Sequence, residues 1–303
     1  MPSKNRKKLA ALPASYPVTK PGEHLDMSDL RVCVDRYLPE DQVVLFAKLA
    51  VQENPFNKPS TVGVRAFSGP TPLSMALVTA KKWQNGRTLR CAFLDGTQAQ
   101  RELVRRVAPQ WSQYANINFD FGSTPDVAEI RVSFMQQGAW AYIGTDALGI
   151  PRDQCTVNFG FIDEATVLHE FGHVLGCIHE HQHPEAGIPW NKPVVYQYYG
   201  GPPNNWSRQL VDTNIFERYS RDITQFSVYD KSSIMHYPVD PRLTDGRFTV
   251  GWNRMLSQAD KTFIAQAYPR DSSVNPVISA VTLPTTGTYA IAEVNGKKVM
   301  TFN

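Results

Sequence analysis

The feature that most constrains this chain is a run of histidines with fixed spacing. Residues 169–179 read HEFGHVLGCIH. On a helix, side chains four positions apart lie on the same face, so His169 and His173 can direct two imidazoles at one metal ion. Gly176 can adopt a positive φ, which lets the helix end and the chain turn back. That turn would bring His179 to the same point.

Three neutral nitrogen ligands are typical of a catalytic zinc ion, because the fourth position stays open for water. Zinc lowers the pKa of that water and polarises a substrate carbonyl. Glu170 can approach such a site without being a ligand, so it can accept the proton and pass it to the leaving amine. The alternative is a set of ordinary core or surface histidines, which would not require a glycine at the helix end. The motif predicts metal-assisted hydrolysis.

A second motif, SIMHY, occupies residues 233–237. A methionine in a tight turn beneath three imidazoles would give the metal site a soft, polarizable floor. Considered alone, Met235 would be read as a core methionine, since Met commonly fills gaps in cores.

Composition excludes several classes of protein. The chain has 303 residues, 42% of them hydrophobic and 19% charged, which indicates a globular protein. The formal net charge is only +3, and much of the positive charge lies among prolines in residues 1–23. We expect these residues to form a flexible arm and not a nucleic-acid surface. No run approaches the ~20 apolar residues of a membrane span. No apolar segment of the signal-peptide type follows the basic start, so cytoplasmic location, export by another route and prior removal of a signal all stay open.

Periodicity predicts alternating elements from about residue 70 onward. The expected helices cover 41–52, 72–83, 98–114, 163 into the histidine motif, and 257–268; the expected strands cover 88–94, 117–121, 129–134, 141–144 and 156–161. Helices interleaved with strands favour a layered α/β arrangement. The residues after 269 alternate between polar and apolar and predict a small β-appendage.

Five segments resemble those of the metzincins, and within them most closely the astacins of the divergent microbial type. They are HExxHxxGxxHE at 169–180, SxMHY at 233–237, LSQAD with a later Ala-Tyr at 256–268, WQNG at 83–86 and AWAYIG at 139–144. The resemblance spans about 75–270. It implies an α+β metzincin-type zincin domain with a twisted, mostly parallel sheet, an antiparallel edge strand, an active-site helix and an irregular C-terminal subdomain.

The same resemblance implies roles for individual residues. It makes His169, His173 and His179 the ligands of one Zn²⁺ ion, Glu170 the general base and Met235 the Met-turn residue. Tyr237 would be a fifth, displaceable ligand that also hydrogen-bonds the oxyanion. An extended substrate would pair with the strand that carries Trp140, Ala141 and Tyr142. Glu180 would tie down a mature N-terminus once a leader is removed.

We therefore expect three parts: an N-terminal arm and candidate pro-segment at 1–70, a catalytic domain at 71–270 with its cleft near 180, and an appendage at 271–303. The predicted function is a zinc-dependent endopeptidase; the alternative is a catalytically silent or latent metzincin fold that serves as a binding module. The expected partner is a protein or peptide substrate, with no nucleic acid and no membrane, and the expected oligomeric state is a monomer. The resemblance favours secretion.

The chain also departs from the astacin pattern. Its four cysteines, Cys33, Cys91, Cys155 and Cys177, do not show the family's disulfide spacing, and one or two bridges stay open. The FxGD switch of astacin leaders is missing upstream of residue 75. One hypothesis is that the Cys33 thiolate occupies the open zinc position of a latent form, as leader cysteines do in some metzincins; the alternative is simple burial.

Two expectations concern the surroundings of the site. We expect the pocket for the residue after the scissile bond to come from the segment between His181 and Tyr237, where one of Arg208, Arg218 and Arg221 could select acidic side chains if it points inward. His181, His183 and His236 are expected to line the cleft or face solvent, because three other histidines already fill the first coordination shell.

Overall fold

The computed structural model describes residues 33, 36, 38, 42–58, 81–201, 204–218, 228–270, 289–294 and 297–302. The expected flexible arm at 1–23 lies outside these residues, as do most of the expected pro-segment and the first part of the expected helix at 72–83. The expected division of the chain into three parts therefore stays a prediction.

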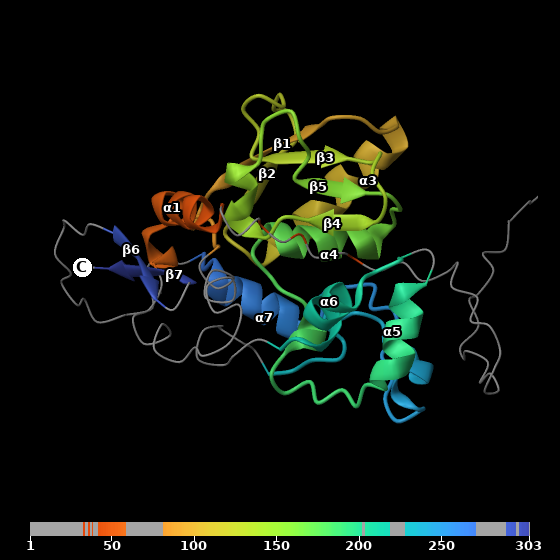
Figure 1. The fold of residues 1–303 in the computed structure, drawn as a ribbon. Coiled ribbons are helices and arrows are strands. Elements are labelled where there is room, and N and C mark those ends of the chain that lie inside the picture. Colours follow the sequence, from red (N-terminus) through yellow and green to blue (C-terminus); the bar gives the residue numbers. More distant parts are fainter. Residues whose placement is uncertain are drawn as a thin grey trace, which may run out of the picture.

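A five-stranded sheet forms one layer of the molecule (Figure 1). Its strands, in spatial order, are β2 (Asn118–Asp120), β1 (Thr88–Phe93), β3 (Ile130–Ser133), β5 (Val157–Phe159) and β4 (Ala139–Ala141). β2, β1, β3 and β5 run parallel, whereas β4 pairs antiparallel with β5 at the edge. This arrangement confirms the expected α+β fold, with a mostly parallel sheet and an antiparallel edge strand.

Alpha helices and one pair of antiparallel strands accompany this sheet, with short 3₁₀ and π helices between them. The helices are α1 (Val43–Glu53), α3 (Gln98–Val107), α4 (Glu164–Val174), α5 (Lys192–Gly200), α6 (Arg208–Val211) and α7 (Gln258–Ala267). In Figure 1, α4 lies beneath the sheet, and α5, α6 and α7 lie on the far side of α4 from the sheet. The tail forms an antiparallel pair of strands, β6 (Tyr289–Val294) and β7 (Lys297–Phe302), which agrees with the expected β-appendage.

Three predicted elements differ from the structure. The helix expected over 98–114 is α-helical only to Val107 and continues as a 3₁₀ helix at Ala108–Gln113. Pro109 explains the change, because proline removes a backbone donor and clashes with the preceding turn. The strand expected at 141–144 lies earlier, at Ala139–Ala141, because Gly144 takes φ +50° and begins a 3₁₀ helix.

Residues 81–83 are also not helical, although the pattern predicted the end of a helix there. Their backbone groups bind partners far away in the sequence. The carbonyl of Lys81 accepts from the N–H of Thr145, and the N–H of Trp83 donates to the hydroxyl of Tyr268. In a helix these groups would bond to residues three or four positions away. Here they bond to residues far away in the sequence, so tertiary contacts override the local helical preference.

Buried aromatic side chains hold α4 in place by donating hydrogen bonds to its backbone carbonyls and to that of the residue that follows it. The indole of Trp111 donates to the carbonyl of Leu168, and the indole of Trp83 donates to the carbonyl of Val174. The hydroxyl of Tyr268 donates to the carbonyl of Leu175. Trp83, Trp111 and Tyr268 are almost fully buried. The carbonyls of Val174 and Leu175 lie at the helix end, where backbone acceptors lack partners within the helix, and all three bonds fix the position of the histidine helix.

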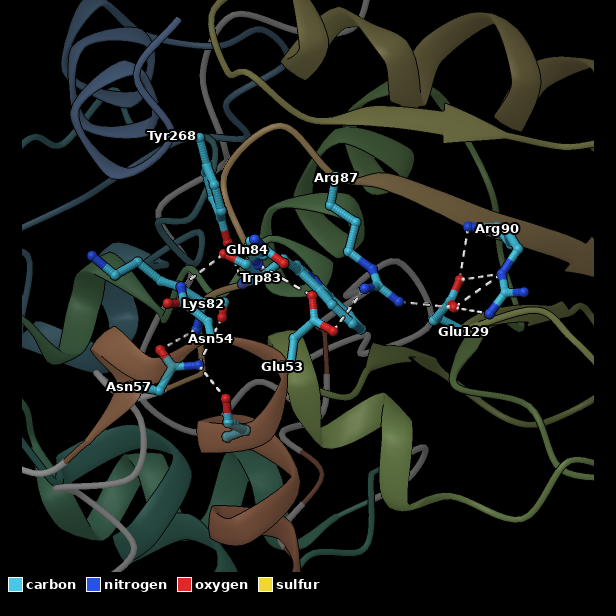
Figure 2. A network of polar contacts seen from close by, with 11 residues as sticks. Glu53, Asn54, Asn57, Lys82, Trp83, Gln84, Arg87, Arg90, Glu129 and Tyr268 are labelled. Carbon is cyan, nitrogen blue, oxygen red and sulfur yellow. Dashed lines mark hydrogen bonds and ion pairs between the residues drawn. The ribbon is translucent and has the colours of Figure 1, made fainter. Parts of the chain in front are cut away.

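Helix α1 and the 3₁₀ turn that follows it, Pro55–Asn57, dock onto residues 82–83 through buried side chains (Figure 2). Asn57 Nδ2 donates to the carbonyls of Ala50 and Lys82, and Asn57 Oδ1 accepts from the N–H of Lys82. Asn54 Nδ2 donates to the carbonyl of Trp83. Phe46 is 1% exposed, and its ring lies against Gly149, where an added Cβ would collide with the ring. Residues 46–57 are thus anchored to the fold.

All four cysteines fall within the described residues; each is buried, and none forms a disulfide with another. Cys177 belongs to the main hydrophobic cluster, which fits the interpretation of a small buried hydrophobe. None of the helices in the described ranges combines the length and apolar character that a bilayer-spanning helix needs.

Candidate metal centre

The three predicted histidines converge on one point. The Nε2 atoms of His169 and His173 lie 3.2 Å apart, those of His169 and His179 also 3.2 Å, and those of His173 and His179 3.0 Å. With Cys33 they form a group whose potential ligand atoms all lie within 4.8 Å of one another. The structure therefore brings together the three residues that the motif singled out.

Local geometry explains the convergence. Asp163 caps α4 by accepting from the N–H of Thr166, and the helix carries His169 and His173 on one face. Gly176 then takes φ +92°, a conformation that side chains with a Cβ rarely adopt. The N–H of Cys177 bonds back to the carbonyl of Gly172, which closes the turn and delivers His179.

The donor set fits a zinc ion. The Nδ1 atoms of His169 and His173 lie 2.7 Å and 2.9 Å from the carbonyls of Ile234 and Cys177. A carbonyl only accepts, so Nδ1 carries the proton and each Nε2 presents a lone pair to the cluster. Burial, and next the neighbouring His169, lower the pKa of His179 well below its ordinary value, which keeps this imidazole neutral. In a tetrahedral site with zinc–nitrogen bonds near 2.0–2.1 Å, ligand nitrogens lie about 3.3 Å apart, close to the spacing found here.

Two further groups face the same point. Glu170 is fully buried, and its Oε2 lies 3.5 Å from Cys33 Sγ. Cys33 Sγ also lies 3.5 Å from Nε2 of His173. Cys33 itself is held by a parallel β-bridge to Ala139 and by a hydrogen bond that its carbonyl accepts from the Tyr237 hydroxyl. The carboxylate and the thiol thus share one side of the histidine cluster.

Met235 packs against α4 at Gly172. It is buried, and a Cβ on Gly172 would collide with its sulfur, so the helix can approach this closely only because residue 172 is glycine. Asp260 holds the turn from below: its carboxylate accepts from the Ser233 hydroxyl and the N–H of Ile234. The same carboxylate accepts from the N–H of Ser257, the residue that caps α7.

The other predicted polar residues surround this centre. The Tyr237 ring is buried between imidazoles, 4.2 Å from His179 and 4.3 Å from His181, measured between ring centres. His181, His183 and His236 are all buried, and His236 lines the pocket beside the centre, so the expected lining of the cleft holds for His236 and none of the three faces solvent. His181 lies under Tyr237 because its Nε2 binds the carbonyl of Asn214.

Glu180 points away from the cluster toward the segment that precedes the methionine turn. Its Oε1 accepts from the N–H of Asp230. Burial raises the pKa of Glu180 to about 8.

A pocket lies beside the metal centre. Cys33, His169, Glu170, Ile234, His236 and Tyr237 face it from the centre, and Phe161, Ala165, Thr166, Pro238, Trp252 and Asn253 complete it. The expected pocket segment between His181 and Tyr237 contributes only its last residues. Its aromatic residues Tyr198, Tyr199 and Trp206 pack instead into a separate cluster with Val195 and Ile215. Arg208 and Arg218 do not line this pocket, and Arg221 lies outside the described residues.

The comparisons with known proteins agree with this geometry. The family model for Astacin, a peptidase family, matches residues 76–268, which is more than half of the chain. This chain belongs to the astacin family of peptidases. Among curated relatives, zinc metalloproteinase nas-5 of Caenorhabditis elegans is 30% identical over 154 residues, and blastula protease 10 of Paracentrotus lividus is 26% identical over 160. These matches cover 50% and 51% of this astacin but only 38% and 25% of the relatives, so it spans well under half of their length.

A solved structure of myroilysin is similar over a larger share of both chains. It is 47% identical and covers 64% of this astacin and 98% of the myroilysin chain, with a TM-score of 0.61. A second myroilysin structure is 48% identical, covers 63% of this astacin and 86% of that chain, and has a TM-score of 0.51. These likenesses support the astacin fold beyond the metal motif.

Sequence reasoning missed three residues that contribute to the site. Asp260 was noted only as part of a family-like segment, and its bonds to the methionine turn have no local signal in the sequence. Trp252 and Asn253 lie in an irregular stretch, and only the fold brings them to the pocket.

Proposed function

We propose that this astacin is a zinc-dependent endopeptidase and that the form described here is latent. The observation that carries the proposal is the convergence of three Nε2 atoms with a buried carboxylate on the open side of the cluster. His169, His173 and His179 would hold one Zn²⁺ ion, and a bound ion would acidify a water and polarise the scissile carbonyl. The proposed substrate is a protein or peptide, and the family resemblance supports a secreted enzyme.

Glu170 is the proposed general base. Its Oε2 faces the place that Cys33 Sγ occupies, so it would face whatever molecule replaces the thiol. From there it takes a proton from the attacking water and passes that proton to the nitrogen of the leaving amine. Its full burial suits this transfer, because a carboxylate shielded from bulk water interacts more strongly with a nearby proton donor.

Tyr237 is the proposed donor to the carbonyl oxygen. Its hydroxyl already donates to a carbonyl, that of Cys33, beside the histidine cluster. A substrate carbonyl in the same place would accept the same bond, which would grow stronger as negative charge develops on its oxygen. Met235 would support the three imidazoles from below. The edge strand with Trp140 and Ala141, together with Tyr142 directly after it, would pair with the substrate backbone.

Latency rests on Cys33 and α1. The Sγ of Cys33 lies among the metal-binding atoms, where a thiolate would take the position that water needs. The anchored helix α1 keeps the segment that carries Cys33 close to the cleft. We therefore propose that residues 1–70 act as a pro-segment that must leave the cleft before the enzyme can act.

Casein cleavage and zinc content, measured together, test these proposals. We expect Glu170→Gln to retain zinc but lose cleavage, since the side chain keeps its shape and loses its basicity. Cys33→Ser is expected to raise the activity of the intact chain, whereas Cys177→Ser, at a cysteine buried in the core, serves as the matched control. A chain that binds no zinc would refute the whole proposal. If the chain binds zinc but stays inactive even as Cys33→Ser, a binding module becomes the better account. If Cys33→Ser cleaves no faster than the parent, the latch is refuted.

A further inference from the structure

Arg36 occupies a defined position on the edge of the sheet. Its guanidinium carbon lies 3.8 Å from the centre of the Trp140 ring, and its Nη2 donates a hydrogen bond of 3.4 Å to Gln136 Oε1. Trp140 belongs to β4, the strand expected to pair with substrate, and Gln136 lies just before it. Cys33, three positions ahead of Arg36, bridges to Ala139 of the same strand. The guanidinium thus lies on the substrate side of the molecule.

The amide of Gln136 is oriented by other contacts. Its Nε2 donates to Cys155 Sγ at 3.1 Å, which turns Oε1 toward Arg36. Its backbone is clamped as well: the N–H donates to Asn158 Oδ1, and Asn158 Nδ2 donates to the carbonyls of Gln136 and Gly138. Asn158 is fully buried in β5. The acceptor is therefore held in place by the sheet itself.

The Trp140 ring is also held in a fixed orientation. It packs edge to face with Tyr142, with the ring centres 5.8 Å apart, and it is only 3% exposed. The face of an indole attracts cations through its quadrupole, and a planar guanidinium can in addition stack on it. Burial raises the pKa of Tyr142, while the charge of Arg36 acts in the opposite direction, which places that charge close to the second ring too.

We infer that Trp140 and Gln136 form a subsite for a cationic side chain of a peptide substrate, and that Arg36 fills this subsite in the structure described here. The inference rests on the proposed function, because a peptide lying along β4 is what would carry a side chain to this place. Three residues of extended chain span about 10 Å, so the cationic residue should lie within about three positions of the scissile bond. Arginine should bind better than lysine, because its planar group both stacks and donates to the amide oxygen.

Binding of labelled peptides tests the inference without depending on catalysis. The protein is the full chain, loaded with zinc, with Cys33→Ser and Arg36→Ala to remove the two side chains that occupy the metal centre and the subsite, and Glu170→Gln to prevent cleavage. The peptides differ only in carrying arginine, lysine or citrulline at one position, scanned over three residues on each side of the scissile bond. Citrulline has the shape of arginine without its charge. At one position we expect arginine to bind roughly 3- to 30-fold more tightly than citrulline.

Two variants then connect that preference to the subsite. Trp140→Leu keeps an apolar side chain but removes the aromatic face, so the arginine-to-citrulline ratio should fall toward one. Gln136→Glu adds a negative charge beside the guanidinium, so the ratio should rise. Met135→Leu, on a neighbouring side chain that is 79% exposed, should leave it unchanged.

Each outcome either supports or overturns the inference. A ratio that responds to both variants in these directions supports it. The inference is overturned if the ratio of arginine-peptide to citrulline-peptide affinity is near one at every position. It is also overturned if neither variant changes that ratio, or if the protein binds none of the peptides. Cleavage of the same peptides by the form that retains Glu170 reports separately on the proposed function. An enzyme that cleaves without charge preference contradicts only the subsite, and a protein that prefers arginine but cleaves nothing contradicts only the peptidase.

Discussion

Replacing Phe46 by alanine should loosen α1 while leaving the catalytic region folded. The ring is 1% exposed and fills the space against Gly149, where even an added Cβ would collide with it. Removing a fully buried phenylalanine costs about 3–5 kcal/mol, because transfer free energy is lost and a cavity remains. Since α1 packs at the margin of the fold, beside the turn at Gly144–Gly149, this cost should fall mainly on the local opening of α1.

That free energy corresponds to a large change in the population of the open state. A loss of about 3–5 kcal/mol raises the opening equilibrium constant by roughly 100- to 4,000-fold. The hydrogen bonds of Asn54 and Asn57 with residues 82–83 are present in both proteins, so they lower the opening constant of each equally and cancel in this ratio. The segment that carries Cys33 should leave the cleft correspondingly more often.

Two measurements on the intact chain check this prediction. Hydrogen exchange of the α1 amides should become faster by about the same factor, with the amides of β1 and α4 much less affected. The zinc-loaded chain should also begin to cleave casein sooner. Leu45→Ala is the matched control, because Leu45 lies on the same helix and is 53% exposed. Equal exchange rates in α1 for the two variants would refute the reasoning, as would a Phe46→Ala protein whose β1 and α4 exchange as fast as its α1.

Three further predictions follow from single side chains and from the metal. Gly172→Ala would drive a Cβ into the Met235 sulfur. We therefore expect thermal melts to show about 1–3 kcal/mol of destabilisation and metal analysis to show weaker zinc retention. Gly251→Ala, where no atom lies within 4 Å of the added Cβ, should change neither the stability nor the zinc content. Burial raises the pKa of Glu129, but hydrogen bonds from Arg90 outweigh burial and hold it below its ordinary value. This carboxylate therefore stabilises the fold above its unfolded pKa of about 4.5, and the stabilisation is lost as the pH falls below that value. Glu129→Gln should accordingly cost about 1–3 kcal/mol in urea unfolding near neutral pH and much less in acid well below that pKa; a difference that does not shrink on acidification would contradict this. Chelation should lower the thermal midpoint, since free zinc at about a thousand times its Kd contributes roughly 4 kcal/mol, and a metal-independent melt would argue against a structural contribution from the ion.

Much of the metal centre could be predicted because its signal is local. Histidines four apart on one helix face, a carboxylate between them and a glycine at the helix end are properties of eleven consecutive residues, and the structure places them as the spacing indicates. The alternation of strands and helices could be predicted as well, because hydrophobic periodicity is also a local property of the sequence. Boundaries failed where a single residue decided them, as at Pro109 and Gly144.

The remaining features depend on residues that are distant in the sequence. A lone cysteine is most often simply buried, and nothing in the sequence around Cys33 states that its thiol lies beside Glu170. Trp252 and Asn253 reach the pocket beside the histidines only through the path of the C-terminal part, and the expected role of the segment between His181 and Tyr237 stays a prediction. Arg36 and Trp140 are separated by a stretch of chain that gives no sign of their contact.

The sequence by itself thus determined the helix that bears the histidines, the turn at Gly176 and the chemistry that these residues support, since helix periodicity and the φ of glycine act over a few residues. Only the tertiary structure decided what fills the cleft and what holds it: Cys33 among the histidines, Arg36 on Trp140, and Asp260 beneath the methionine turn. The physical reason is that these contacts are made by the packing of side chains on elements whose relative placement is set by burial of the whole core and not by any local pattern.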